Sequence, residues 1–99
     1  MSVASRFLSS SGVRLAPAAP HPLRGGGTFA FELPAATRVE LALFDLAGRL
    51  VKSLIAGEPR TAGRHTVAID TSKLAPGVYL ARLRTGLGDA QQRTVVLGR

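Results

Sequence analysis

The sequence of 99 residues contains no cysteine and no tryptophan. Without cysteine, neither a disulfide framework nor a thiolate zinc site is available, so apolar packing and hydrogen bonds have to stabilise the fold. No apolar run approaches the roughly 18 residues of a membrane-spanning helix, so we expect no membrane span. A chain this short forms one small domain and leaves no room for a deep catalytic cleft between two lobes.

Acidic residues are scarce. Only 6 Asp and Glu stand against 13 Lys and Arg, which gives a formal net charge of +7. A basic balance makes nucleic acid and anionic surfaces candidate partners. Part of the excess, however, comes from Arg6, Arg14 and Arg24, which lie in an N-terminal segment without any acidic residue.

That N-terminal segment differs in composition from the rest of the chain. Residues 1–27 are rich in Ser, Ala, Pro and Gly, which predicts a flexible leader or linker, and residues 28–99 are predicted to form the folded domain. The segment has no continuous apolar stretch of the kind found in a secretory signal peptide. Its Gly25–Gly27 run lacks the lysine of a phosphate-binding loop and is interpreted as a hinge.

From residue 28 onward, apolar and polar residues alternate in short runs, and no apolar pattern keeps a helical period. In the first run, Phe29, Phe31 and Leu33 alternate with smaller or charged residues, which is typical of a strand with one buried face. Further strands are predicted at 39–43, 49–55, 65–69, 78–83 and 93–97, with a loop over 57–63. An edge segment near Leu15–Ala16 is a candidate seventh strand.

Short strands separated by regular turn signals are typical of an all-β sandwich or barrel and not of βαβ units. We therefore predict an all-β fold, a small antiparallel immunoglobulin-like β-sandwich of six to seven strands with antiparallel neighbours throughout. The residues predicted to form its core are Phe29, Phe31, Leu33, Val39, Leu41, Leu43, Val51, Leu54, Val67, Ile69, Tyr79, Leu83 and Val95.

Three ordered segments resemble one known module. They read VELALFDLAGR from Val39, AGRH from Ala62 and LAPGVYLARL from Leu74, and PHPL from Pro20 precedes them. Together they resemble the C-terminal sorting domain of proteins exported by the type IX (Por) secretion system, and the related immunoglobulin-like domain of the flagellar hook-capping protein. The Trp-Asp-Gly of the hook-capping branch is replaced here by IDTS from Ile69, which favours the sorting branch.

The resemblance implies a non-enzymatic secretion, sorting and cell-surface anchoring module of a larger exported protein. It implies recognition by the outer-membrane secretion machinery and removal by its sortase-like peptidase, with the cleavage site expected in the leader, within residues 9–27. Anionic lipopolysaccharide is a further candidate partner. The protein is then expected to be secreted, or held at the outer-membrane cell surface, as part of a longer precursor whose signal peptide is not in this chain. The alternative is a structural protein–protein interaction module, like the hook-capping domain, that packs through an exposed strand.

Most residues that carry the resemblance also have a structural explanation. Gly48 and Gly77 suit turns, and a buried Tyr79 needs a partner for its hydroxyl. Leu74 lies among polar residues and is expected to close one end of the sandwich. The full set of family-motif residues is Pro20, Pro22, Asp45, Gly48, Arg49, Gly63, His65, Leu74, Gly77, Tyr79 and Leu83.

No catalytic, metal or cofactor site is expected. The two histidines, His21 and His65, lack further ligands at sensible spacing, since Asp70 lies five residues after His65 and so on the opposite face of a strand. The serines crowd into the leader, and no Gly-x-Ser-x-Gly sequence precedes a helix. The protein is therefore not expected to be an enzyme.

The arginines of the last two strands are the remaining candidates for binding. Arg82 and Arg84 share a strand face, and Arg93 is expected to lie opposite them. The preferred interpretation is that these charges protect an edge strand from aggregation; an anionic protein or lipopolysaccharide partner is the second. Nucleic acid is disfavoured as a partner because the aromatic residues fall in core register, whereas binders of this size interleave exposed aromatics with basic residues.

Overall fold

The structure is a computed structural model that describes residues 12–98, and strands make up all of its regular elements. In chain order these are β1 (Arg14–Leu15), β2 (Leu23–Arg24), β3 (Gly26–Leu33), β4 (Thr37–Asp45), β5 (Leu50–Arg60), β6 (Gly63–Asp70), β7 (Gly77–Thr85) and β8 (Asp89–Leu97). The predicted all-β class is therefore confirmed. Within residues 12–98, no helix is long and apolar enough to cross a membrane.

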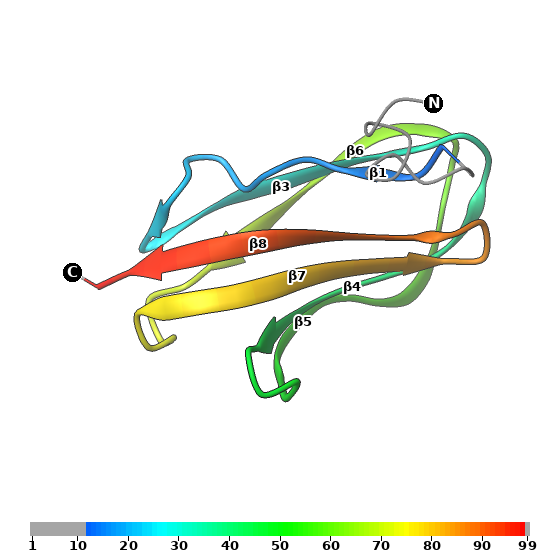
Figure 1. Ribbon diagram of the computed structural model, residues 1–99. Helices are drawn as coiled ribbons and strands as arrows, with labels where there is room; N and C mark the ends of the chain where they lie inside the picture. Colours follow the sequence, from blue (N-terminus) through cyan, green and yellow to red (C-terminus); the bar gives the residue numbers. More distant parts are fainter. Residues whose placement is uncertain (1–11, 99) are drawn as a thin grey trace, which may run out of the picture.

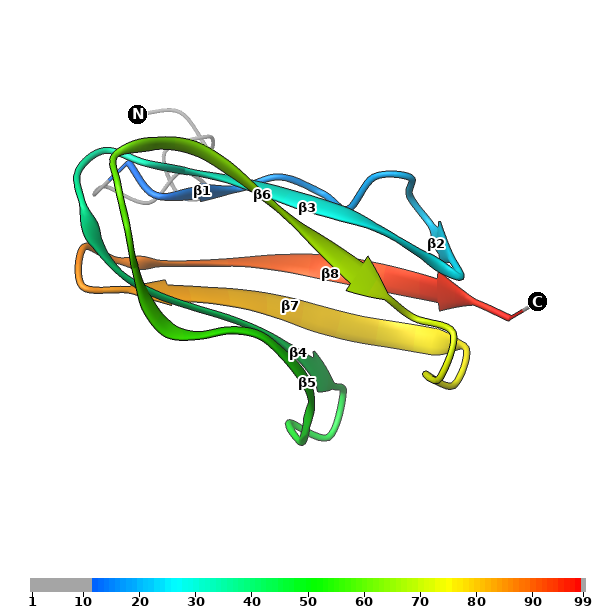
Figure 2. The same cartoon turned by 180° about the vertical axis from the view of Figure 1, so that it is seen from behind.

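Two sheets face each other in a sandwich (Figures 1 and 2). One has three strands in the order β1-β3-β6, and the other has five in the order β2-β8-β7-β4-β5. Neighbouring strands are antiparallel in every pair except β2 and β8, which run parallel. The expectation of antiparallel neighbours throughout is therefore wrong at β2, a two-residue strand that pairs Leu23 with Val96.

Strand β5 is longer than its sequence suggests. It continues to Arg60, so most of the loop predicted over residues 57–63 belongs to a strand. Three register shifts interrupt its pairing with β4, and Pro59 lies next to its C-terminal residue, Arg60. Proline is tolerated there because β5 lies at the edge of its sheet, where one side of the strand needs no donor.

The core lies between the two sheets and contains most of the residues that alternation predicts. The buried apolar residues are Val13, Leu15, Ala18, Leu23, Phe29, Phe31, Leu33, Val39, Leu41, Leu43, Ile55, Ile69, Tyr79, Ala81, Leu83 and Val96. Val51, Leu54 and Val67 are only partly buried against it. On β5 the buried residue is Ile55 and not Leu54, because the bulges shift the face that the strand presents.

Strand β8 has the register opposite to the predicted one. Its inward positions are set by β7, where buried Tyr79 lies opposite Thr94. Thr94 and Val96 are therefore buried, and Val95, predicted to be in the core, points outward and is half-buried. The inward Gln92 donates its side-chain amide to the Leu15 carbonyl at 2.9 Å, so this polar residue is satisfied inside the sandwich.

The N-terminal segment is part of the sandwich from residue 12 onward. Val13 and Leu23 are fully buried, β1 pairs with β3, and the Ala19 and Thr28 backbones exchange two hydrogen bonds of 2.8 and 2.9 Å. The prediction of a flexible leader over residues 1–27 is therefore wrong for 12–27, because apolar side chains there cover the core. Residues 1–11 lie outside the described part of the chain.

The predicted hinge at Gly25–Gly27 is also wrong. A β-carbon on Gly27 would lie 2.4 Å from the Leu23 Cδ2 atom and 2.6 Å from the Ala19 carbonyl oxygen. One on Gly26 would lie 2.6 Å from the Ile69 carbonyl oxygen. These two glycines thus allow close backbone packing and are not a flexible joint.

Candidate recognition surface

The β4–β5 turn is held by a single carboxylate. Asp45 Oδ1 accepts hydrogen bonds from the backbone amides of Ala47 at 3.0 Å and Arg49 at 2.9 Å, and Oδ2 lies 3.3 Å from the Arg49 Nε. Gly48 has a φ of +87°, in the left-handed region that favours glycine. The family-motif residues Asp45, Gly48 and Arg49 are thus one structural unit, a rigid turn.

The electrostatics of this turn follow from those contacts. The Arg49 backbone amide, assisted by the Arg49 side chain and the Ala47 amide, holds the pKa of Asp45 below its ordinary value. At the C-terminal end of β6, the Ser72 amide similarly lowers the pKa of Asp70, with Lys52 and Lys73 contributing. Both carboxylates are therefore ionised and bonded at neutral pH.

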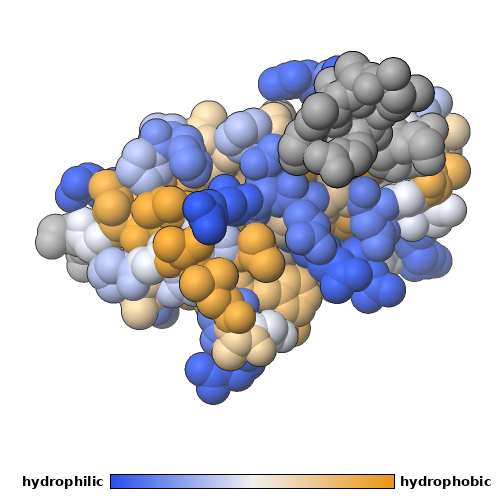
Figure 3. Space-filling view, viewed as in Figure 1, coloured by the Kyte–Doolittle hydropathy of each residue, from blue (hydrophilic) through white to orange (hydrophobic). Residues whose placement is uncertain are grey.

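The rigid turn displays two leucines to solvent. Leu46 is 68% exposed and Leu50 is 56% exposed, which is high for large apolar side chains. Beside them on the outer face of the five-stranded sheet, Phe44 lies opposite Leu80, and Val78 lies opposite Val95, all half-buried. In Figure 3, hydrophobic side chains gather over the left-hand ends of β7 and β8 and over the β4–β5 turn below them.

We call these six residues, Phe44, Leu46, Leu50, Val78, Leu80 and Val95, the outer apolar patch. An apolar patch on a small basic domain is typical of a protein contact surface. Sequence reasoning missed it because Phe44 and Leu80 alternate with core residues and look like ordinary strand positions, and because Val95 is itself predicted to be in the core. The available signal was Leu46, a large apolar residue inside a turn where polar residues are usual.

Arg82 and Arg84 lie on the other half of the same face. Arg84 is opposite Asp89, and Arg82 Nη2 lies 3.8 Å from the Asp89 Oδ2, so an acidic residue offsets part of their charge. Arg93 is opposite Leu80 and not opposite Arg82 or Arg84, contrary to expectation.

The edge-protection interpretation is also wrong for Arg82 and Arg84. Strand β7 is the middle strand of the five-stranded sheet, with β8 on one side and β4 on the other. Charges on a middle strand do not guard an edge. Their outward position leaves them as rim charges beside the outer apolar patch.

His65 lies at the end of the sandwich opposite the β4–β5 turn, and its contacts there are structural. Its ring stacks on Phe31 with centroids 5.3 Å apart, and its Nε2 lies 2.8 Å from the Thr61 carbonyl oxygen. Gly63, with a φ of +113°, allows the turn that leads into β6. No group of three His, Cys, Asp or Glu that suits a metal ion occurs among residues 12–98.

The remaining family-motif residues support the end of the sandwich that carries the β4–β5 turn, or its core. Tyr79 is buried, and its hydroxyl donates to the Ala75 carbonyl at 2.5 Å, which closes the loop before β7. Leu74 packs against the core from that loop, and Leu83 is fully buried. Gly77 has a φ of +159°, close to extended backbone, so the left-handed turn geometry expected of it is found clearly only at Gly48.

Pro20 and Pro22 are exposed in the loop that leads to β2, and each follows a cis peptide bond. Both precede Leu23, whose side chain is fully buried. His21, between the two prolines, is exposed as well.

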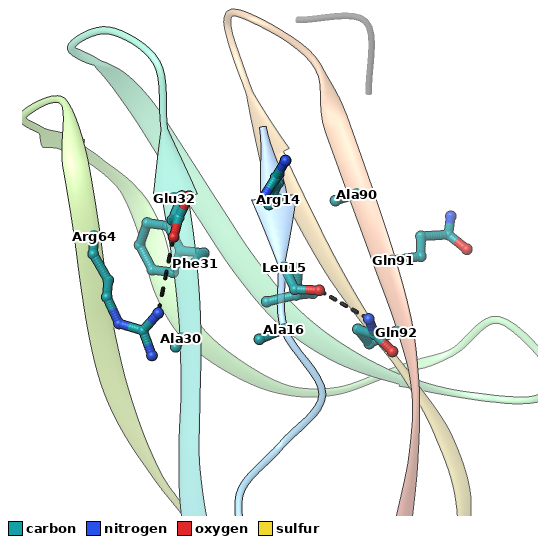
Figure 4. Close-up of a pocket in the computed structure, with 10 residues that line it drawn as sticks. All are labelled: Arg14, Leu15, Ala16, Ala30, Phe31, Glu32, Arg64, Ala90, Gln91 and Gln92. Carbon is teal, nitrogen blue, oxygen red and sulfur yellow. Dashed lines mark hydrogen bonds and ion pairs between the residues drawn. The ribbon is translucent and has the colours of Figure 1, made fainter. Parts of the chain in front are cut away.

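A groove of about 510 Å³ opens beside β1, where this strand of two residues leaves a gap between the sheets (Figure 4). Leu15 and Phe31 lie along it, and the Glu32–Arg64 ion pair at 3.9 Å borders one side. The Gln92 hydrogen bond to Leu15 crosses it (Figure 4). The groove is thus a consequence of incomplete strand pairing between β1 and its neighbours.

Comparison with known proteins identifies the family of the chain. Residues 19–97 match a family described as "Secretion system C-terminal sorting domain". The matched segment runs from the loop before β2 to the end of β8, so it takes in all of the five-stranded sheet. None of the curated proteins and none of the solved structures matches the chain. The chain belongs to the family of secretion system C-terminal sorting domains, the sorting signals of type IX (Por) secretion.

Proposed function

We propose that this domain is the non-enzymatic sorting and cell-surface anchoring module of a larger exported protein, recognised in its folded form by the outer-membrane secretion machinery. The observation that carries the proposal is the family match over residues 19–97. Each sheet joins strands that are far apart in the sequence, such as β3 with β6 in one sheet and β2 with β8 in the other. This arrangement supports recognition of a folded surface over recognition of a linear peptide.

The outer apolar patch is the surface best suited to that recognition. Leu46 and Leu50 project from a turn that Asp45 already holds rigid, so a partner that covers them orders little additional backbone. The arginines at the rim, Arg82 and Arg93, add positive charge beside the apolar centre. An apolar centre with a charged rim is the usual composition of a protein–protein interface.

The packing of the N-terminal segment bears on the proposed cleavage. A peptidase needs extended and accessible backbone, and residues 13–27 supply buried side chains and strand pairs instead. We therefore place the site of removal before Gly12. Anionic lipopolysaccharide is part of the same proposal, as the group to which the cargo would be joined once the domain has been removed.

A structural interaction module is the second candidate function. One observation favours it: within residues 12–98, β6 has a hydrogen-bonded neighbour on one side only. Such an edge is available to a further strand.

The test is a fusion of residues 1–99 to a reporter protein that carries a signal peptide, expressed in a strain with type IX secretion. We expect the reporter at the cell surface or in the medium. A folded reporter that stays in the periplasm contradicts the proposed function.

The recognised surface is tested in the same strain with the double variant Leu46→Ser and Leu50→Ser. We expect export to fall at least about tenfold without loss of folding, since both side chains are largely exposed. Leu87→Ser is the matched control, because Leu87 is 37% exposed in the β7–β8 turn at the other end of the sandwich. Equal export by the double variant and the wild type assigns recognition to another surface.

A further inference from the structure

Among the strands of residues 12–98, β6 is a regular edge strand. It pairs with β3 along its whole length, from Gly63 opposite Leu33 to Asp70 opposite Gly26, without a bulge. The other long edge strand, β5, has three register shifts and a proline, which are devices that discourage pairing with another chain. Strand β6 has neither, and in Figure 2 it lies across the front of the molecule.

The backbone groups of β6 divide between the two sides of the strand. On β3, the even-numbered Thr28 and Ala30 bond to the N-terminal segment, so its odd-numbered residues face β6. In an antiparallel pair, only alternate residues exchange hydrogen bonds with a given neighbour. Residues 65, 67 and 69 of β6 therefore bond to β3, and residues 64, 66, 68 and 70 point their N–H and C=O groups away from the sheet.

The side chains of β6 are complementary to those of a second β6 in the antiparallel direction. If Val67 lies opposite itself, Arg64 lies opposite the partner's Asp70, and Thr66 lies opposite the partner's Ala68. This register uses all four outward-pointing residues as hydrogen-bonded pairs. It also aligns opposite charges at both ends of the strand.

The inner face agrees with the same register. His65 and Val67 are half-buried at the rim of the core, and Ile69 is buried. Across the new strand pair, His65 meets the partner's Ile69, and the two Val67 side chains meet at the two-fold axis. Partly exposed apolar surface would be covered on both chains.

The charged groups remain available for this pairing. Arg64 is 66% exposed although it lies 3.9 Å from Glu32, and it has further guanidinium N–H groups to donate. Asp70 accepts the Ser72 amide through Oδ1 at 2.9 Å, and its pKa is lowered, so it is ionised at neutral pH.

We propose that two copies of this chain associate through their β6 edges, antiparallel and about a two-fold axis at Val67, which joins the two three-stranded sheets into one continuous sheet. The pair leaves the outer apolar patch uncovered, since that patch is on the other sheet. The association is thus separate from recognition by the secretion machinery, and either can fail without the other.

Cysteine substitution reads the register directly, because the native chain has no cysteine. Across a non-hydrogen-bonded antiparallel pair, the Cα atoms lie about 4.5 Å apart, which is within the range of a disulfide. We expect Val67→Cys in the 99-residue chain to form a disulfide dimer at least about tenfold faster than Thr66→Cys, or than Ser53→Cys on the exposed edge strand β5. A rate for Val67→Cys no greater than for Ser53→Cys overturns the proposal, and fastest crosslinking of Thr66→Cys overturns the register.

Charge reversal tests the same pairing without a covalent bond. Arg64→Asp and Asp70→Arg each place like charges opposite each other twice, and we expect the dimer Kd in sedimentation experiments to rise about tenfold or more. The double variant restores opposite charges and should recover the wild-type Kd within about threefold. Arg93→Asp changes the net charge as Arg64→Asp does, but far from β6, and should leave the Kd nearly unchanged.

Thermal unfolding of each variant establishes that it is folded, which matters because Arg64 also pairs with Glu32. All of these measurements should be carried out at an ionic strength of about 0.15 M, because repulsion between two basic chains is then screened beyond about 8 Å. A wild-type chain that stays monomeric up to about 1 mM, a concentration at which even weak pairs form, overturns the proposal.

Discussion

Asp45 shows how one side chain defines a surface at a distance from itself. It bonds two amides and one guanidinium, and the turn that results holds Leu46 and Leu50 in the solvent. The sequence predicts the turn, since Asp and Gly occur at the positions that its geometry requires. It does not predict that the leucines stay exposed, because that depends on how far the hairpin extends beyond the sheet.

Stability should depend on pH through Asp45. Its folded pKa lies below the ordinary value of 3.8, so its stabilising effect is present above that value and is lost as the pH falls through the folded pKa. In Asp45→Asn, we expect a lower free energy of unfolding than in the wild type at about pH 6, and a smaller difference at about pH 2. Urea unfolding across this pH range measures both.

Asp70 has the same sign and provides an independent comparison, since its pKa is also lowered. The free energy of unfolding of the wild type should fall below about pH 4, and Asp70→Asn should remove the part of that fall that comes from protonation of Asp70. A difference between Asp45→Asn and wild type that stays constant with pH would assign the role of Asp45 to shape and not to charge.

The role of Gly27 cannot be recognised from the composition of its segment. Three glycines in a row suggest flexibility, and nothing in the sequence reveals that Leu23 and the Ala19 carbonyl lie against this backbone. We expect Gly27→Ala to lower the free energy of unfolding by about 1–3 kcal/mol, because the new methyl group has no space. Gly86→Ala is the control, since a β-carbon there would lie 3.1 Å from one side-chain atom, the Thr37 Oγ1, and would not lie within 3 Å of any backbone atom. Equal costs for the two variants, in urea unfolding, would contradict the close packing.

Among the elements, alternation predicts a strand well where one face is uniformly apolar. In β3, β4 and β7 the predicted core residues are the buried ones, because Phe29, Leu41 and Leu83 alternate with polar or small residues. In β8, the inward positions include the polar Gln92 and Thr94, and the outward positions include Val95 and Leu97. Its register is set by pairing with β7, which no local pattern contains.

Of the two short strands, β2 is not predicted from the sequence, for a different reason. A strand of two residues, such as β1 or β2, contains no period to detect. The segment near Leu15 was a candidate edge strand, and β1 confirms it. The parallel strand β2 depends on Leu23 entering the core beside Val96, which is a tertiary fact.

The register of β8 leads to a prediction at the same scale. Val96→Ala removes buried methyl groups and should lower the free energy of unfolding by about 2 kcal/mol. Val95→Ala, on the outer face, should cost less than half as much because Val95 is half-buried. Urea unfolding of the two neighbouring variants compares identical chemistry on opposite faces. A larger cost for Val95→Ala would restore the register predicted from the sequence.

For the whole molecule, the family match and the folded unit begin at different places. The match begins at residue 19, yet the sandwich includes β1 and the buried side chains of Val13, Leu15 and Ala18. Segments with small side chains and proline contribute little recognisable pattern. They nevertheless close the core here, because β3 would otherwise be an open edge on that side.

The folded unit should therefore require residues 12–18. A chain of residues 12–99 is expected to unfold like the full chain, and a chain of residues 19–99 should lose about 3–6 kcal/mol, since Val13 and Leu15 are no longer buried. Urea unfolding measures this loss. A chain of residues 12–99 with Val13→Ser and Leu15→Ser is the control that keeps the backbone pairing with β3 and removes only the apolar burial. If the chain of residues 19–99 were as stable as the full chain, residues 12–18 would lie on the core without stabilising it. Cleavage of the exported protein could then also occur after Gly12.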